Sequence, residues 1–148
     1  MPQIRYTNLA DLKPWPDAAR RHSKAQIKQI IASIRRFGFT NPIIIDEDWQ
    51  ILAGHGRVAA ARAMGLEEVP AIRIDTMSEA DKRAYVIADN RLALNAGWDR
   101  KILGDELEKL LAEDLNFDIA ITGFSIAETV ELIDGPAEKT KPAVSPVR

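Results

Sequence analysis

The sequence predicts an α+β fold, in which a small mixed β-sheet is flanked by helices and followed by a helical C-terminal subdomain and a loose tail. Short β-branched runs alternate with helical segments over residues 1–74. Apolar residues at helical spacing dominate 79–134, and 135–148 is rich in proline and charge without periodicity. The expected domains are therefore 1–98, 99–134 and 135–148.

The first segments are read from alternation, proline and capping. Gln3–Thr7 is expected to be an edge strand, because its apolar residues alternate on one face. Leu9–Pro16 should lack regular structure, because it contains two prolines. Ser23 and Gln26 have the spacing of a capping box, so a helix with isoleucines on one face is expected at about 24–37, ended by the glycine that follows.

Three more strands complete the expected sheet. Ile43–Ile45 is β-branched throughout and should be an inner strand, with 49–53 as its hairpin partner. The acidic turn 46–48 between them is typical of a solvated hairpin tip, although three carboxylates could also bind a cation. A further strand is expected at 69–74, with Pro70 at its start or on an edge.

The second half of the chain is expected to be helical. Each helix follows a residue that is typical of a helix N-cap. The expected helices are about 79–88 after Ser78, 100–113 after Asp99, and a short one after Ser125, which forms a capping box with Glu128. The first of them is expected to break into an irregular stretch at 89–98.

Composition limits the classes of protein. The 148 residues, 46% hydrophobic and 28% charged, suit one globular core. No apolar run approaches the roughly 20 residues of a membrane span, and the N-terminus has no signal-peptide pattern, so a cytoplasmic location is expected. The absence of cysteine excludes disulfides, thiolate metal sites and a cysteine nucleophile.

Charge is unevenly distributed along the chain. Residues 1–73 hold 11 Lys and Arg against 7 Asp and Glu, whereas 74–148 hold 9 against 15. The basic half favours a bound polyanion, but it is not the broad basic stripe of a domain that grips duplex DNA by itself.

The segment QILAGHGRVAAARAMG, residues 50–65, is the strongest candidate site. A buried strand at 51–53 enters a helix at 57–64 through the turn Gly54-His55-Gly56, which leaves unpaired backbone N–H groups at the helix start. Such a start binds anions, and Arg57 can place a guanidinium beside the same anion. Phosphate is the ligand that such a site suits best. The alternative is that the turn has only a structural role as a tight connection.

Two further pairs carry weaker signals. Arg20 and Arg21 precede a helix start, where the helix dipole does not favour cations, so they are either a solvated basic patch or an anion contact. Asp89 and Asn90 supply hard oxygen ligands. Mg²⁺ uses ligands of this type when substrate phosphates provide most of its coordination. Helix termination is the alternative for this pair.

Several motifs occur together in a specific order. They are PDAARRH at 16–22, Ala32-Ser33-Ile34 to Gly38 with Asn41-Pro42-Ile43, LAGHGR at 52–57 continuing to Gly65-Leu66 and Val69-Pro70, and ADN at 88–90. Over about residues 3–98 this order resembles the N-terminal domain of ParB, in the ParB/sulfiredoxin-like superfamily. The longer run AYVIADNRLALNAGWD at 84–99, with AGHGR and the FD…TGFS ending, resembles the ParB-like module at the front of bacterial and phage DNA-modification methylases.

The resemblance implies a domain that binds a nucleoside triphosphate, typically CTP, with Mg²⁺, and uses it as a switch with slow hydrolysis. It implies phosphate contacts from Gly54, His55, Gly56 and Arg57, with Arg20 or Arg21 closing over them and with Thr40 and Asn41 near the base or ribose. Asp89 and Asn90 stand where ParB proteins carry a metal-binding Glu-Asn pair. A homodimer is one arrangement that the resemblance allows.

The sequence also departs from the family pattern. The ParB phosphate motif is Gly-Glu-Arg-Arg with a further basic residue two positions on, and here His55, Gly56 and Ala59 replace the Glu, the first Arg and the last basic residue. Two cationic contacts are missing, each worth about 1.5–3 kcal/mol, so phosphate affinity should be lower, or another nucleotide or anion preferred. His55 also occupies the position of the sulfiredoxin cysteine, which excludes sulfiredoxin chemistry.

Three functions are consistent with these observations. The first is a nucleotide-binding domain, with or without slow triphosphatase activity, that regulates or positions a DNA-acting partner such as a DNA methyltransferase. It would contact DNA through a linked or partner domain. The second is a non-catalytic DNA-associated adaptor with a vestigial loop, and the third, a metal-dependent nuclease, lacks the acidic cluster of a two-metal site. The chain contains no methyltransferase motif, and no helix-turn-helix is expected, because the C-terminal helices lack basic character.

Overall fold

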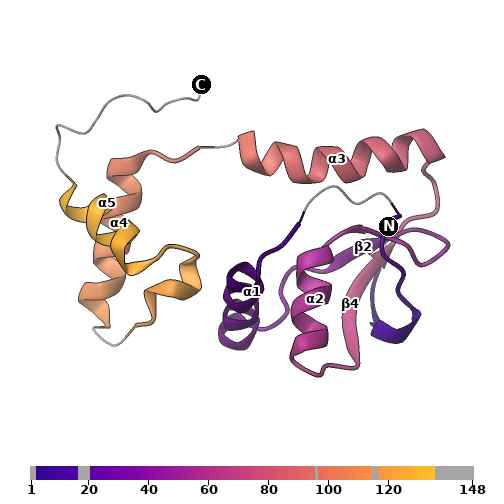
Figure 1. The fold of residues 1–148 in the computed structure, drawn as a ribbon, viewed down its shortest axis with the longest axis horizontal. Helices are drawn as coiled ribbons and strands as arrows, with labels where there is room; N and C mark the ends of the chain where they lie inside the picture. Colours follow the sequence, from indigo (N-terminus) through magenta and orange to yellow (C-terminus); the bar gives the residue numbers. More distant parts are fainter. Residues whose placement is uncertain (1–2, 17–20, 96, 115–116, 136–148) are drawn as a thin grey trace. The chain divides into compact units, whose positions relative to one another are not determined.

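The computed structural model describes residues 3–16, 21–95, 97–114 and 117–135, without the side chains of 93–95 and 120. The chain divides into two compact units, residues 1–91 and 92–148. The first contains the sheet, and the second contains helices α4 and α5 (Figure 1). No helix in the described ranges is both long and apolar enough to span a membrane.

Four strands form the mixed sheet that the sequence predicts. They are β1 (Ile4–Asn8), β2 (Ile43–Ile45), β3 (Ile51–Ala53) and β4 (Glu68–Arg73). The order in the sheet is β1-β4-β2-β3; β1 and β4 pair antiparallel, β4 and β2 pair parallel, and β2 and β3 pair antiparallel. The predictions of an edge strand at the N-terminus and of an inner strand at 43–45 are confirmed.

Two apolar clusters form on the two faces of the sheet, because successive strand residues point to opposite sides. In the first cluster, β2 residues Ile43 and Ile45 pack with Val58 and Ala61 of helix α2 (His55–Ala63). In the second cluster, the core residues are Trp15, Leu52 and Val86, with Ile44, Met77 and Tyr85 packed against them. Val86 and Tyr85 belong to helix α3 (Glu79–Asn95), so helices flank the sheet as predicted.

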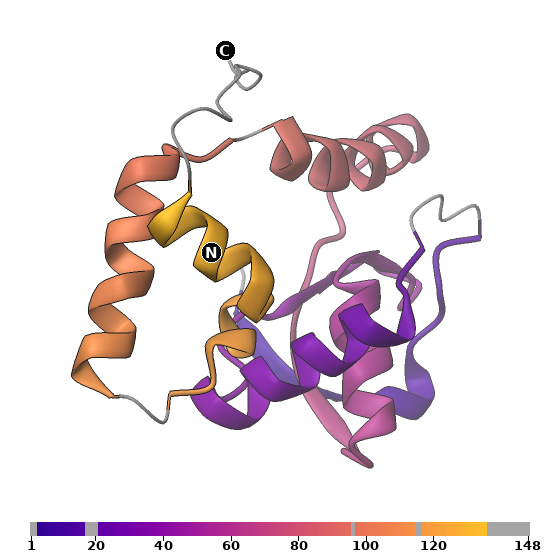
Figure 2. The ribbon, with the colours of Figure 1, turned by 60° about the vertical axis from the view of Figure 1, so that its left-hand side comes forward.

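Helix α1 (Lys24–Phe37) has the predicted bounds and lies beside α2 (Figures 1 and 2). The Ser23 side chain accepts the backbone N–H of Gln26 at 3.0 Å. The Gln26 carboxamide is 3.0 Å from Nδ1 of His22. The side chain of Gln26 therefore interacts with His22. Of the two hydrogen bonds of the predicted capping box, the structure shows the one that Ser23 accepts.

Three local predictions are wrong. A short 3₁₀ helix, η1 (Leu9–Asp11), replaces the expected irregular start of Leu9–Pro16, because the Asn8 side chain accepts the N–H of Ala10 and both prolines come later. Pro70 lies third in β4 rather than at its start, and β4 is an inner strand rather than an edge strand. The structure tolerates it there because β2 pairs with β4 only from Ala71 onward.

The third error concerns the end of α3. The helix continues to Asn95 instead of ending at residue 88, so Asp89 and Asn90 lie inside it. The Asn90 side chain donates to the carbonyl of Val86, four residues back in the same helix, at 3.0 Å. A side chain that bonds within the helix does not terminate it, and the leucines and alanines that follow favour helix.

The second unit contains α4 (Arg100–Glu113), η2 (Ile119–Thr122) and α5 (Ile126–Asp134). The predicted caps of both α-helices are confirmed, including a complete capping box at Ser125. A Cβ at Gly104 would lie 2.5 Å from the carbonyl oxygen of Leu132, so glycine is what lets α4 approach the α5 backbone. The predicted tail lies outside the described residues from 136 onward.

Candidate functional site

The start of α2 has the geometry of an anion site. Gly54 is its N-cap, with φ +104° and no side-chain cap, and the first helical bond joins the N–H of Val58 to the Gly54 carbonyl at 2.9 Å. The amides of His55, Gly56 and Arg57 precede that bond and have no helical acceptor. The helix begins two residues earlier than predicted, so Gly56 belongs to its first turn.

Gly56 is needed for packing rather than for positive φ. A Cβ there would lie 3.0 Å from Cε1 of His22 and 3.0 Å from Cδ1 of Ile30. The missing side chain thus lets the start of α1 approach the start of α2. Arg21, which precedes His22, is exposed, and Arg20 lies outside the described residues.

His55 is held as a neutral acceptor. Its Nε2 accepts the backbone N–H of Trp15 at 3.2 Å, which places the ring proton on Nδ1. Burial lowers the pKa of His55, and the nearby His22 lowers it further. His55 therefore anchors the segment around Trp15 to the loop, and its Nε2 is already used.

This arrangement makes stability depend on pH through His55. Because the pKa of the folded ring lies below its ordinary 6.5, the unfolded chain takes up the proton first as the pH falls. The free energy of unfolding should therefore decrease below about pH 6.5 and level off once the folded ring is also protonated. Urea titrations between about pH 5 and 8 would measure this slope.

The variant His55→Gln keeps an acceptor for Trp15 and should flatten the slope. His22→Gln should keep most of it, since burial is the larger cause of the shift at His55. Equal slopes in the wild type and in His55→Gln would contradict this interpretation.

Arg57 is the central cation of the site. Its Nη2 donates to the carbonyl of Pro42 at 3.1 Å, and its Nε is buried without a hydrogen-bond partner. Burial lowers the pKa of Arg57, while the charges of Asp89 and Tyr85 oppose that shift. The Pro42 bond also brings the exposed residues Thr40 and Asn41, which precede Pro42, toward α2.

The predicted metal pair is only partly brought to the loop. Asp89 is exposed and interacts electrostatically with Arg57, so α3 places one carboxylate near the start of α2. Neighbouring helical residues do not share a face, and the amide nitrogen of Asn90 is bonded to Val86. The described residues contain no group of three or more His, Cys, Asp or Glu that could hold a metal ion.

An ion cluster that the sequence does not reveal ties α3 to the β2–β3 turn. Nζ of Lys82 lies 3.0 Å from Asp46, 2.9 Å from Glu47 and 3.5 Å from Glu79. The hydrogen bond that Lys82 donates to Glu47, with the help of Asp46, raises the pKa of Lys82. Asp46 is completely buried, so the interpretation of 46–48 as a solvated tip is wrong for this residue.

Two family models match the chain. The model described as "ParB N-terminal domain" matches residues 1–90. The model described as "ParB-methyltransferase HTH domain" matches residues 101–147, which contradicts the expectation that no helix-turn-helix is present. That expectation relied on helix charge, and charge is not what defines the motif.

Curated relatives agree with the first match. The "ParB-like nuclease domain-containing protein YnaK" of Escherichia coli is 42% identical over 81 residues, which cover 55% of this chain and 93% of that protein. "Stage 0 sporulation protein J" of Bacillus subtilis is 33% identical over 91 residues, covering 59% of this chain. The chain spans only about a third of the length of the latter protein, 32%.

A solved structure supports the fold. It is the C-terminally truncated chromosome-partitioning protein ParB from Caulobacter crescentus, complexed with CTP-gamma-S, with a TM-score of 0.73 and 22% identity. The similarity covers 88% of this chain and 77% of that one. At this identity it shows a shared fold, which is the α+β class predicted from the sequence.

Proposed function

This chain belongs to the ParB N-terminal domain family, whose model matches residues 1–90, and from that premise we propose that it binds a nucleoside triphosphate, CTP or ATP, with Mg²⁺. The bound nucleotide regulates or positions a DNA-acting partner. The triphosphate lies at the start of α2, against the amides that follow Gly54. The Caulobacter relative was solved with CTP-gamma-S, which supports CTP as the first candidate.

The observation that carries the proposal is the state of Arg57. A guanidinium normally keeps all its N–H groups hydrated or bonded, and burying one without a partner is unfavourable. Here Nε is buried and unpaired beside the uncapped start of a helix. A phosphate at that point would accept from the guanidinium and from the helix amides together, so it satisfies both sets of donors.

The other predicted residues are assigned from their neighbours in the chain. His22 lies against Gly56, so Arg20 or Arg21, which precede it, is proposed to close over the phosphates. Thr40 and Asn41 lie near the base or ribose, because Arg57 bonds the adjacent Pro42.

Mg²⁺ is held by the phosphates and by Asp89, with Asn90 in a supporting role. The exposed carboxylate of Asp89 suits a hard cation whose other ligands are mostly phosphate and water oxygens. Where hydrolysis occurs it is slow, with water as the nucleophile and with Arg57 offsetting charge on the transferred phosphoryl group.

The test compares two arginines of α2 that make equivalent structural bonds. Arg57 donates to the Pro42 carbonyl at 3.1 Å, and Arg62 donates to the Leu9 carbonyl at 3.2 Å. A nucleotide at about 100 times its dissociation constant should add about 2.7 kcal/mol to the free energy of unfolding. We expect one Mg²⁺-nucleotide among CTP, ATP, GTP and UTP to raise the thermal midpoint of the wild type and of Arg62→Ala, but not of Arg57→Ala.

The remaining outcomes separate the alternatives. No rise with any nucleotide at millimolar concentration would overturn the proposal and favour a non-catalytic adaptor with a vestigial loop. Metal-dependent nicking of plasmid DNA that is lost in Asp89→Ala would favour a nuclease, the activity in the name of the YnaK relative.

We propose that the second unit helps to position the DNA-acting partner. The match to a ParB-methyltransferase HTH domain favours a DNA methyltransferase as that partner. Residues 92–148 hold four lysines and two arginines against eleven acidic residues, so this unit is poorly suited to neutralising DNA phosphates alone. We therefore expect DNA contact to depend on a linked or partner domain, or on a second copy in a homodimer.

A further inference from the structure

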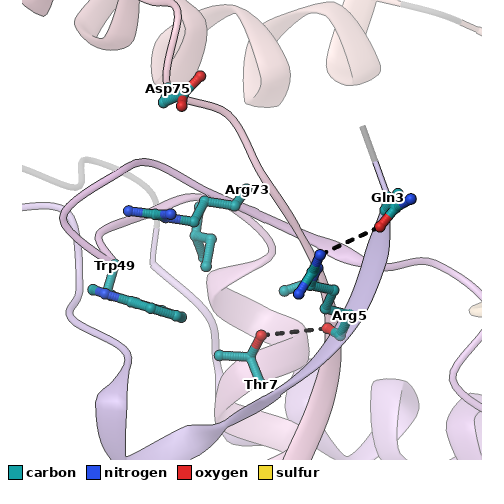
Figure 3. A pocket seen from close by; sticks show the side chains of 8 residues that line it. Gln3, Arg5, Thr7, Trp49, Arg73 and Asp75 are labelled. Atoms are coloured by element: carbon teal, nitrogen blue, oxygen red, sulfur yellow. Dashed lines mark hydrogen bonds between the residues drawn. The ribbon is translucent and has the colours of Figure 1, made fainter. Parts of the chain in front are cut away.

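A polar cavity lies on the sheet of the first unit, away from the α2 loop. Its volume is about 460 Å³, within the range of small-molecule sites. The polar residues around it are Gln3, Arg5, Thr7, Trp49, Arg73 and Asp75 (Figure 3). Ile45 at the end of β2 lines this cavity, whereas Gly54 approaches Ile43 at the start of the same strand.

Strand pairing concentrates positive charge in this cavity. Arg5 of β1 lies opposite Ala71 of β4, and Arg73 is two residues further along β4, so both arginines project from the same face. Like charges at diagonal positions of neighbouring strands repel. Asp75 also lines the cavity, and among the described residues neither arginine forms an ion pair with a carboxylate.

The existing bonds leave Arg5 the freer of the two cations. Its guanidinium makes one long hydrogen bond, 3.4 Å to Oε1 of Gln3. Arg73 donates to the Glu47 carbonyl at 2.7 Å and lies over the ring of Trp49, 5.2 Å from its centroid. The guanidinium of Arg73 is therefore held in place, and that of Arg5 is available to bind an anion.

One side of the cavity is aromatic. Trp49 has φ +65°, a left-handed conformation that is rare for a bulky side chain, and it places the indole along one side of the cavity. Backbone strain of this kind gathers at functional sites. Ile45 and Ala71 also line it but are buried by the surrounding side chains, so the exposed indole of Trp49 is the surface that a planar group would cover.

We propose that this cavity is a second ligand site, which binds a nucleotide unit, a planar base joined to a phosphate, either free or within single-stranded nucleic acid. Arg5 contacts the phosphate, and the base lies along Trp49. Gln3 and Asp75 at the rim offer hydrogen-bond partners to the edge of the base. An inorganic anion would leave the Trp49 ring uncovered, and a neutral aromatic ligand would leave the guanidiniums without an anion.

Calorimetric titrations with cytidine monophosphate, a ten-residue thymidine oligonucleotide and inorganic phosphate test this site. They use wild type and Arg57→Ala, so that binding at the α2 loop is removed in one of the two proteins. At least one nucleotide probe should bind both proteins, and the tighter probe identifies the free or the polymeric source. Arg5→Ala should weaken that binding at least tenfold, as expected for a lost charge-assisted hydrogen bond.

The matched control is Arg35→Ala, which removes an exposed arginine at the end of α1 and should leave the affinity within twofold. The indole N–H resonance of Trp49 gives a second readout: it should shift when the nucleotide probe is titrated into Arg57→Ala, in which binding at the α2 loop is removed, and that of Trp15 should not. The proposal is overturned by equal affinity for inorganic phosphate, by an unchanged affinity in Arg5→Ala, by binding that disappears in a folded Arg57→Ala, or by no binding.

Discussion

Replacing Asp46 by alanine should lower the free energy of unfolding by about 3–5 kcal/mol, because the change removes a buried carboxylate that binds both the Lys82 ammonium and two backbone amides. Oδ2 of Asp46 lies 3.0 Å from Nζ of Lys82, and both side chains are buried. Oδ1 of Asp46 also accepts the N–H groups of Asp48 and Gln50, both at 2.9 Å. The substitution therefore leaves a buried ammonium with one partner fewer and two turn amides without their acceptor. Chemical denaturation would measure the loss.

Two comparisons identify the cause. Asp48→Ala removes an exposed carboxylate from the same turn and should change stability little. The double variant Asp46→Ala/Lys82→Met removes both buried charges and should be more stable than Asp46→Ala alone. If the double variant is the less stable of the two, the loss comes from the turn and not from the weaker charge balance at Lys82.

Gly54→Ala should cost about 2–5 kcal/mol and should also weaken nucleotide binding. At φ +104° an alanine is strained, which costs about 1–2 kcal/mol. Its Cβ would also lie 2.7 Å from Cγ2 of the buried Ile43, and overpacking typically adds about 1–3 kcal/mol. The same Cβ would be 3.0 Å from Nη2 of Arg57, so the cation must move. Denaturation and the nucleotide thermal shift would measure the two effects.

Gly65 provides the matched control for this change. Its φ is +78°, and a Cβ there would meet nothing within 4 Å. Gly65→Ala should therefore show only the strain of a left-handed alanine, about 1–2 kcal/mol, and should leave nucleotide binding unchanged. Equal losses at Gly54 and Gly65 would show that the contact with Ile43 is relieved without cost.

The parts of the fold that were predicted correctly depend on short-range signals. Ser23, Asp99 and Ser125 cap their helices through residues three positions away, and such spacings can be read directly from the chain. The strand, glycine and helix at 51–63 follow from the same kind of local pattern. The fold class needed only the alternation of these segments.

The predictions are wrong where a residue type can form alternative contacts that a local pattern does not distinguish. Asn90 belongs to a class of common helix terminators, yet here it bonds within α3. Asp46 lies in an acidic run that is typical of a solvated turn, yet it is buried against a lysine 36 positions away. The helix-turn-helix match was missed because net charge was used as its signal.

The sequence by itself determined the α+β class, most helix and strand bounds, and the glycine loop with Arg57, because caps, periodicity and glycine turns act over a few residues. Only the tertiary structure decided the burial of Lys82 with Asp46, the electrostatic influence of Asp89 on Arg57, and the cavity that Arg5 and Arg73 line. These arrangements bring together residues that are tens of positions apart. Their geometry depends on strand register and helix packing, which no local pattern encodes.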